Sequence, residues 1–155
     1  MLSKFPSQGL PVVVDKKMCD FNNHMNVVYY QHIFEDGCHD FYRKMGFSKE
    51  YFKEGYSSFT LETNIRYLKE LLEGETATPY FRLINNNLKL IHYAGIIVNE
   101  SGEVSSFSEH VLAHIDMKIR RTSQMSKHLL SRLKIMMAEH NAAGPIDFDL
   151  RLKIR

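Results

Sequence analysis

The sequence has little of several features that mark particular classes of protein. Cysteine occurs only as Cys19 and Cys38 in 155 residues, too few for a disulfide framework or a zinc site. No apolar run approaches the ~18 residues that cross a membrane. The segment from Met1 to Leu10 lacks the apolar core of a signal peptide. We therefore expect a reduced, cytoplasmic protein with no membrane partner.

Charge of one sign is also scarce. The formal net charge is +2 at pH 7, too small by itself to indicate a nucleic-acid partner. A hydrophobic share of 44% and a charged share of 25% are ordinary for a globular domain and exclude disordered, collagen-like and coiled-coil classes. No internal repeat or low-complexity linker divides the chain. We predict a single domain over 1–155, with a core over about 10–142 and a tail at 146–155.

Apolar side chains recur at helical spacing after a polar cluster near the N-terminus. The stripe consists of Val27, Tyr30, Phe34, Cys38, Phe41 and Met45. Its spacing of three and four predicts one long helix from about Asn26 to Met45, ended by Gly46. Further apolar and aromatic residues lie off the stripe, so we expect this helix to be buried on much of its surface.

A second helix is predicted near the C-terminus, and a short one at 49–54. Met125, Leu129, Leu133 and Met136 again follow helical spacing. Thr122 or Ser123 is the expected N-terminal cap, and the segment from Asn141 to Pro145 is expected to end the helix.

Between the helices the apolar period changes toward two, which is typical of strands. We predict strands at 11–15, 58–67, 76–85, 89–98 and 103–116. The connections between the last three are short and rich in Asn and Gly, which favours an antiparallel meander. An antiparallel sheet must cover one apolar face, so the fold class is α+β with the long helix packed against the sheet.

The tail from Ile146 to Arg155 alternates apolar and charged residues without a break, which predicts a strand. Paired antiparallel with a second copy about Arg151, it would set opposite charges against each other. We hypothesise a strand at a subunit interface. An edge strand in its own subunit and a frayed end are the alternatives.

The densest polar cluster runs from Asp20 to Asn26, directly before the long helix. Free N–H groups at a helix start can hold a developing negative charge, which suits the oxyanion of acyl transfer. Asp20 is a candidate general base or nucleophile, and Asn22 and His24 are candidates to position the water or the carbonyl. The alternative is that these residues only cap the helix.

The same residues resemble a known family. Asp20, His24, Met25, Asn26, Tyr30, Phe34 and Glu35 match without a gap the motif of the 4-hydroxybenzoyl-CoA thioesterase-like branch of the hot-dog superfamily. The Asp-x-Asn-x-His pattern also resembles plant acyl-carrier-protein thioesterases. Further along, Ile65–Leu68 and Glu109–Arg121 resemble the family's second and last strands. Over about 10–142 the arrangement is similar to bacterial thioesterases linked to carnitine and betaine breakdown.

The resemblance implies a hot-dog fold, in which a curled antiparallel sheet of about five strands wraps round the long helix. It implies metal-free hydrolysis of an acyl-CoA, or less often of an acyl-carrier protein, with coenzyme A present only as part of the substrate. Asp20 would act as base or nucleophile. The site would lie between subunits of a homodimer or homotetramer. The sequence departs from the motif at two positions: Asn23 stands where many members have Gly, and Val27 where many have a second Asn. Because Asn tolerates the left-handed conformation, we expect Asn23 to serve in place of the glycine.

Several other residues are candidates for contacts with the substrate. Tyr30 and Phe34 could form a wall for the acyl group, and aromatic walls also suit a quaternary ammonium. Glu35 is either a nucleophile or a buried hydrogen-bonding group. Glu109 and His110 either point into the cleft or lie on the surface.

A basic stretch lies between Met117 and Met137. Arg120 and Arg121, with Lys127, could hold the phosphates of coenzyme A, whereas the alternative is a solvated helix face. The absence of interleaved aromatics argues against nucleic acid.

Two functions follow from these observations. The first is an acyl-CoA thioesterase. The alternative is a non-catalytic hot-dog module that binds an acyl-CoA or a partner protein, since a fold does not fix a function. A binding module has no need of the Asp20 charge, whereas an enzyme loses turnover more than binding without it.

Overall fold

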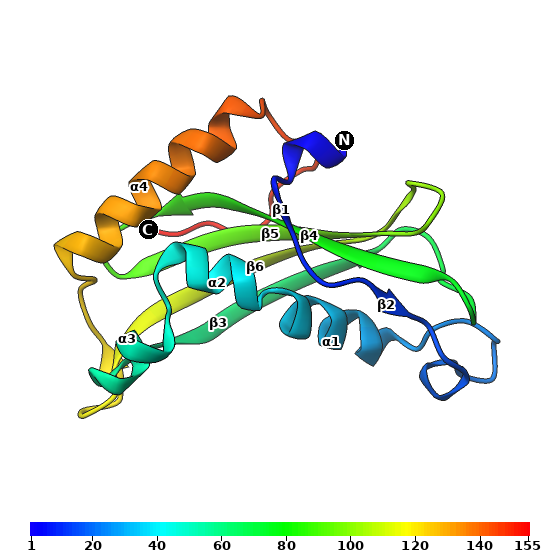
Figure 1. The fold of residues 1–155 in the computed structure, drawn as a ribbon, viewed down its shortest axis with the longest axis horizontal. Coiled ribbons are helices and arrows are strands. Elements are labelled where there is room, and N and C mark those ends of the chain that lie inside the picture. The colour runs from blue at the N-terminus through cyan, green and yellow to red at the C-terminus, as the bar shows by residue number, and fades with distance from the viewer.

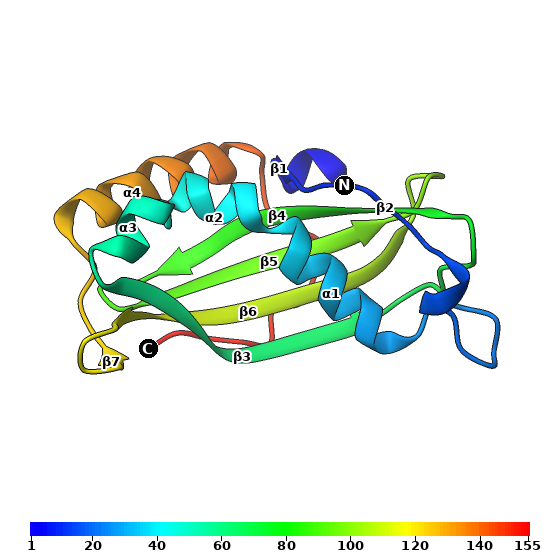
Figure 2. The same ribbon diagram turned by 60° about the horizontal axis from the view of Figure 1, so that its bottom comes forward.

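The computed structural model describes residues 1–155 and shows a curled antiparallel sheet with helices in its concave side (Figure 1, Figure 2). The long strands are β3 (Tyr56–Tyr67), β4 (Thr76–Asn86), β5 (Leu90–Val98) and β6 (Val104–Asp116). Three short strands, β1 (Ser7–Gln8), β2 (Val12–Val13) and β7 (Arg121–Thr122), complete it. The order is β1-β4-β5-β6-β3, with β2 on β4 and β7 on β6. The predicted meander and hot-dog arrangement are confirmed, and β3 forms a free edge.

The helices are α1 (Val27–Gly37), α2 (His39–Met45), α3 (Lys49–Lys53) and α4 (Lys127–Ala142), with 3-10 turns η1 (Leu2–Lys4) and η2 (Lys16–Met18). The prediction of one unbroken helix to Met45 is wrong at Cys38, where α1 ends and α2 begins. At Gly37 the helix passes so close to β4 that an added Cβ would lie 2.5 Å from Pro79 Cγ. Glycine permits this contact but weakens the helix. No helix is long and apolar enough to span a membrane.

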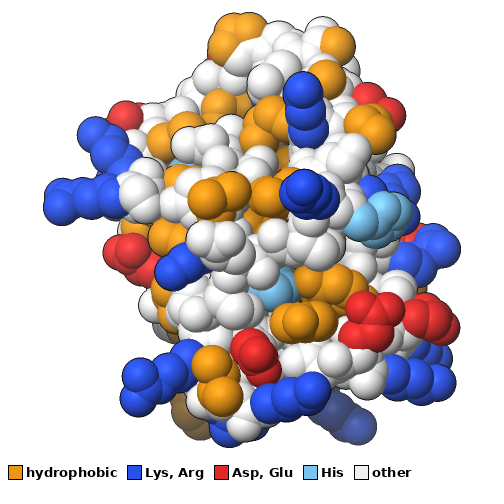
Figure 3. Space-filling model, turned by 90° about the vertical axis from the view of Figure 1, so that its left-hand side faces the viewer, with side chains coloured by type: hydrophobic (Ala, Val, Ile, Leu, Met, Phe, Trp, Pro, Cys, Tyr) orange, Lys and Arg blue, Asp and Glu red, His pale blue; other side chains and the backbone are white.

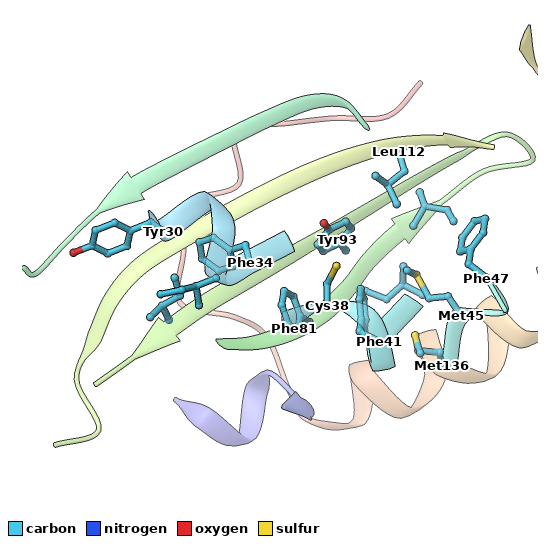
Figure 4. Packing of buried hydrophobic residues seen from close by; sticks show 14 of the residues in the cluster. Tyr30, Phe34, Cys38, Phe41, Met45, Phe47, Phe81, Tyr93, Leu112 and Met136 are labelled. Atoms are coloured by element: carbon cyan, nitrogen blue, oxygen red, sulfur yellow. The ribbon is translucent and has the colours of Figure 1, made fainter. Parts of the chain in front are cut away.

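The predicted apolar stripe faces the sheet over most of its length. Tyr30, Phe34, Cys38, Phe41 and Met45 are buried (Figure 4). Burial raises the pKa of Cys38 to about 12, so its thiol is protonated and serves packing. The first turn departs from the prediction, because Val27 and Val28 are 51% and 53% exposed. The prediction of a largely buried helix is therefore wrong for this first turn, which lies beside the polar cluster.

The ends of α2 and α4 follow local chemistry. Gly46 ends α2 with φ 118°, as its position predicted. The cap of α4 is Ser126, whose Oγ accepts from the Leu129 N–H, so the prediction of Thr122 or Ser123 is wrong. Thr122 is still extended there, because it pairs with Ile115 as part of β7.

The tail lies across the outer face of its own sheet, away from α1 (Figure 2). Its apolar residues point inward, as the alternation predicted, and Ile146, Phe148 and Leu150 cover a cluster that includes Phe107. The alternative of an edge strand in its own subunit is wrong, since no ladder within the chain includes residues 146–155, while the strand at a subunit interface stays a prediction. The frayed-end alternative is also wrong, because Leu152 is 8% exposed.

A buried carboxylate holds the tail in place. Glu109 is fully buried, and its carboxylate accepts from the backbone N–H groups of Arg151 and Leu152 at 3.0–3.1 Å. The Arg66 guanidinium donates to the Asp149 carbonyl at 2.7 Å and lies 3.9 Å from Glu109 Oε2. Glu109 therefore joins the tail to the sheet and turns the tail's donors away from a strand ladder.

We expect Glu109→Ala to destabilise the fold and free the tail. Each buried donor left without an acceptor costs about 1–3 kcal/mol. The variant should lower the midpoint of urea denaturation and let trypsin cut after Arg151 and Lys153 in the native protein. Glu109→Gln keeps an acceptor oxygen and should resist trypsin better. Equal trypsin resistance in wild type and Glu109→Ala would contradict this function of the carboxylate.

Candidate active site

The predicted site cluster folds into a tight hairpin directly before α1. The Asp20 N–H donates to the His24 carbonyl, and the Asn23 N–H donates back to the Asp20 carbonyl, at 3.1 and 3.0 Å. The Asp20 carboxylate accepts from the Asn22 N–H at 2.8 Å. Asn23 has φ 61°, the left-handed conformation that glycine or asparagine adopts with least strain. Asn23 therefore has the left-handed conformation that was expected where the family motif often has glycine, while its role in the site stays a prediction.

The start of α1 presents an unpaired backbone donor. Asn26 is the N-cap, and its side-chain oxygen accepts from the Val28 N–H at 3.2 Å. The Tyr29 N–H donates to the Asn26 carbonyl. The Val27 N–H makes no hydrogen bond within the chain. This donor, at the positive end of the α1 dipole, is free to receive a negative oxygen.

A hollow of about 230 Å³ opens beside this donor. Its lining consists of His24, Met25, Val27, Tyr30, Tyr67, Leu68, Lys69 and Glu70. The rings of Tyr30 and Tyr67 meet edge to face at 5.1 Å. The Tyr30 hydroxyl donates to the Lys69 carbonyl at 3.4 Å, and burial raises its pKa, so the hydroxyl remains protonated. The hollow thus combines aromatic walls with a helix N-terminus.

His24 connects the hairpin to the hollow. Its Nδ1 lies 3.3 Å from the Met25 carbonyl oxygen, and a carbonyl can only accept, so Nδ1 carries the proton. In the neutral ring Nε2 is then an acceptor. Cys19, beside Asp20, is no competing nucleophile: partial burial, together with the nearby carboxylates of Glu73 and Asp20, raises the pKa of its thiol.

Comparison with known proteins identifies the family. The model of the thioesterase-like superfamily matches residues 14–133, which include the hairpin, α1 and the whole long-stranded sheet. The chain belongs to this superfamily. It is 32% identical over 82% of its length to an L-carnitine dehydrogenase/betainyl-CoA thioesterase of Agrobacterium fabrum, of which it covers only 26%. It is 25% identical to a betainyl-CoA thioesterase of Pseudomonas aeruginosa, with 79% of each chain covered.

Solved structures confirm the hot-dog thioesterase fold. A Staphylococcus aureus protein solved in complex with CoA superposes with a TM-score of 0.81 at 24% identity, covering 94% of both chains. A DHNA-CoA thioesterase of the same species superposes with a TM-score of 0.77 at 20% identity, covering 90% of this chain and 95% of its own. At these identities the likeness shows the fold.

Some predicted substrate residues of this thioesterase-like protein lie away from the hollow. Phe34 is buried in the core between α1 and Phe81. Glu35 is exposed and accepts from the Gln31 amide at 3.0 Å, so the prediction of a buried group is wrong. His110 is buried on the concave face, stacked on Tyr93 at 4.6 Å. Glu109 faces the opposite side of β6 and cannot reach the hairpin.

Arg120 and Arg121 lie at the other end of the molecule from Asp20. Tyr56 at the start of β3 pairs with Asp116 near β7, whereas Tyr67 at its end lines the hollow. Twelve residues of strand separate the two ends by about 36 Å, at roughly 3.3 Å per residue. Figure 3 views the β7 end, where Lys and Arg side chains project around hydrophobic ones. One subunit alone does not bring these arginines to the hairpin.

The sequence analysis did not place the segment from Tyr67 to Glu70 in the site, although all four of its residues line the hollow. Tyr67 is the last residue of β3 and the other three follow it, about 40 residues after α1 begins. The match of Tyr30 to the family motif does not indicate which strand end the Tyr30 side chain contacts. The fold brings Tyr67, at the end of β3, beside Tyr30 on α1.

Proposed function

We propose that this protein hydrolyses an acyl-CoA thioester to the free acid and coenzyme A. The observation that carries the proposal is the free Val27 N–H beside a hollow whose wall includes His24 of the Asp20 hairpin. A donor fixed at a helix start stabilises the oxyanion formed when a thioester carbonyl is attacked. A carboxylate held in the adjoining hairpin supplies the base or the nucleophile.

Two routes through Asp20 conserve atoms and charge, one with Asp20 as general base and one with Asp20 as nucleophile. As a general base, Asp20 takes a proton from water while the water oxygen bonds to the carbonyl carbon; the C–S bond then breaks, and the leaving CoA sulfur takes that proton from Asp20. As a nucleophile, Asp20 forms a mixed anhydride as CoA thiolate leaves, and water attacks the anhydride to give the free acid and the Asp20 carboxylate. Attack of ¹⁸O water on the Asp20 carbonyl of the anhydride labels Asp20 in a single turnover, whereas the general-base route labels only the product acid. Tyr30 and Tyr67 shield the reacting centre in both.

We further propose a short acyl group that carries a quaternary ammonium. The hollow is small, and its walls include the Tyr30–Tyr67 pair and the Glu70 carboxylate. Aromatic faces attract such cations by about 0.5–2 kcal/mol. The relatives named betainyl-CoA thioesterases act on an acyl group of this class.

Free-thiol release from two matched substrates tests this proposal. Betainyl-CoA and 3,3-dimethylbutyryl-CoA have the same shape but differ in charge. We expect the charged substrate to have the higher kcat/KM, and Tyr67→Leu to reduce that preference more than Tyr67→Phe does. Equal kcat/KM values for the two substrates would contradict the ammonium preference, while thiol release itself would still support the thioesterase.

A homodimer through the β3 edges completes the proposed site. β3 is a 12-residue edge strand with no neighbour on its outer side, and long free edges are templates for pairing. Leu61 and Tyr67 on this strand are exposed apolar residues, and so is Phe21 in the hairpin. Antiparallel pairing of two β3 strands reverses one copy, so the β7 end of the partner approaches the hairpin. Arg120 and Arg121 of the partner subunit would then be placed to bind the CoA phosphates.

We expect Leu61→Glu to convert this dimer into a monomer and to remove most of the activity. The two copies would bring like charges together at the paired edge. Light scattering after gel filtration gives the mass, and thiol release gives the activity. Leu88→Glu is the matched control, because Leu88 is similarly exposed in the β4–β5 turn. A fully active Leu61→Glu monomer would contradict a site completed by a second subunit.

A further inference from the structure

A second hollow, of about 420 Å³, is lined by residues of the N-terminal segment, the end of α2 and α4. Its lining consists of Pro6, Ser7, Lys44, Arg132, Ile135, Met136, Glu139 and His140. None of these residues belongs to the Asp20 hairpin or to the hollow beside it. The proposed thioesterase reaction uses no group here.

A buried histidine offers an unused donor to this hollow. His140 is 3% exposed, and its Nδ1 lies 2.8 Å from the Leu83 amide nitrogen. A backbone N–H can only donate, so Nδ1 is unprotonated and Nε2 carries the proton. Burial, with Arg82 and Lys44 nearby, lowers the pKa of His140 to about 4, so the ring stays neutral at pH 7. The hydrogen bond at Nδ1 is the only one that the His140 ring makes within the chain, so Nε2–H has no protein partner.

Positive charge around this donor exceeds negative charge. Lys44 and Arg132 line the hollow, and Glu139 is the single acid among the lining residues. Arg82 is 5% exposed, and its Nη1 donates to the carbonyls of Lys4 and Gly144, with no carboxylate within salt-bridge distance. Buried cations are ordinarily paired with an anion. This part of the molecule therefore has an uncompensated positive potential.

The remaining lining is apolar. Ile135, Met136 and Pro6 form walls beside the charged groups, and His140 is fixed by stacking on the Phe41 ring at 6.2 Å and 13°. The donor at Nε2 is thus rigid, while methionine adapts to varied shapes. An oxyanion can meet the His140 and Lys44 donors while an attached apolar group contacts the walls.

We propose that this hollow binds a small organic anion, with an oxyanion head on His140 Nε2–H and Lys44 and an apolar body against Ile135 and Met136. This site is separate from the proposed thioesterase site, so the proposal does not depend on the identity of the acyl substrate. The proposed ligands include small carboxylic acids with an apolar body. Inorganic phosphate has an anionic head but no such body.

Nitrogen-15 NMR of the histidine side chains in the intact protein tests the proposal, with benzoate and inorganic phosphate as probes. We expect benzoate to shift the His140 Nε2 resonance saturably, with a Kd in the millimolar range or tighter. Phosphate should bind more weakly, because it lacks the apolar body. Lys44→Gln should weaken benzoate binding by on the order of tenfold.

Lys134→Gln is the matched control. It removes the same charge from an exposed position on α4 that does not line the hollow, and it should leave benzoate binding unchanged. No saturable shift of His140 with benzoate would overturn the proposal, as would equal weakening by the two lysine variants, which would indicate general charge attraction. If phosphate bound as tightly as benzoate, the proposal that the ligand carries an apolar body would be overturned. The unperturbed remainder of the spectrum shows that each variant is folded.

Discussion

We expect Asp20→Asn to lower the kcat for thiol release by about 10²–10⁴, the range for loss of a positioned acid–base group. The asparagine side-chain oxygen still accepts from the Asn22 N–H, as Asp20 Oδ1 does at 2.8 Å, so the hairpin should persist. KM should change little, because a base acts in the transition state more than in binding. Steady-state kinetics with acyl-CoA measure both quantities.

Asp36→Asn is the control for this variant. Asp36 is an exposed carboxylate on α1, so its loss makes the same change in net charge without touching the hairpin, and its kcat should equal that of the wild type. Hydrolysis that survives Asp20→Asn would contradict the role of Asp20. Acyl-CoA binding without hydrolysis, in wild type and variant alike, would favour the non-catalytic binding module.

We expect Val27→Pro to lower kcat by about 10²–10³, the loss that follows removal of one oxyanion donor. Proline deletes the backbone N–H but suits the first position of a helix. Asn26, the preceding residue, has φ −64° and ψ 144°, which is the extended conformation that proline requires before it. Val27 is half exposed, so little packing is lost, and the urea midpoint should hardly move.

Val27→Ala separates the side chain from the N–H. This variant keeps the donor and shortens the side chain, so its kcat should stay near that of the wild type. Activity retained in Val27→Pro, with the fold intact, would show that the helix N-terminus does not hold the oxyanion.

The sequence was sufficient where the structure depends on contiguous residues. The hairpin from Asp20 to Asn26 lies within seven positions, so its caps, its left-handed Asn23 and its place before α1 could be predicted locally. Strand positions could be predicted from the shift of the apolar period toward two and from the turn residues between the strands, although β5 and β6 are buried on both faces and β3 has no buried residue. The same alternation correctly predicted which tail residues point inward.

Features that depend on distant partners could not be predicted. The break at Cys38 comes directly after Gly37, which lies against Pro79 on β4. The tail forms no strand within its own sheet, and the N–H groups of Arg151 and Leu152 instead donate to Glu109, more than 40 residues away. Tyr67 joins the hollow because the fold brings the end of β3 beside Tyr30 on α1. In each case the deciding neighbour is set by the fold and has no local signal.

The most direct test of the central claim is thiol release from acyl-CoA by four proteins: the wild type, Asp20→Asn, Val27→Pro and the double variant. If carboxylate and helix N–H act on one transition state, each single variant should lose at least about 10² in kcat. The double variant should be slower than either single variant, because the base and the oxyanion donor each stabilise the transition state. Folded wild type that releases no thiol, or a single variant that keeps the wild-type kcat, would contradict a thioesterase site at this hairpin.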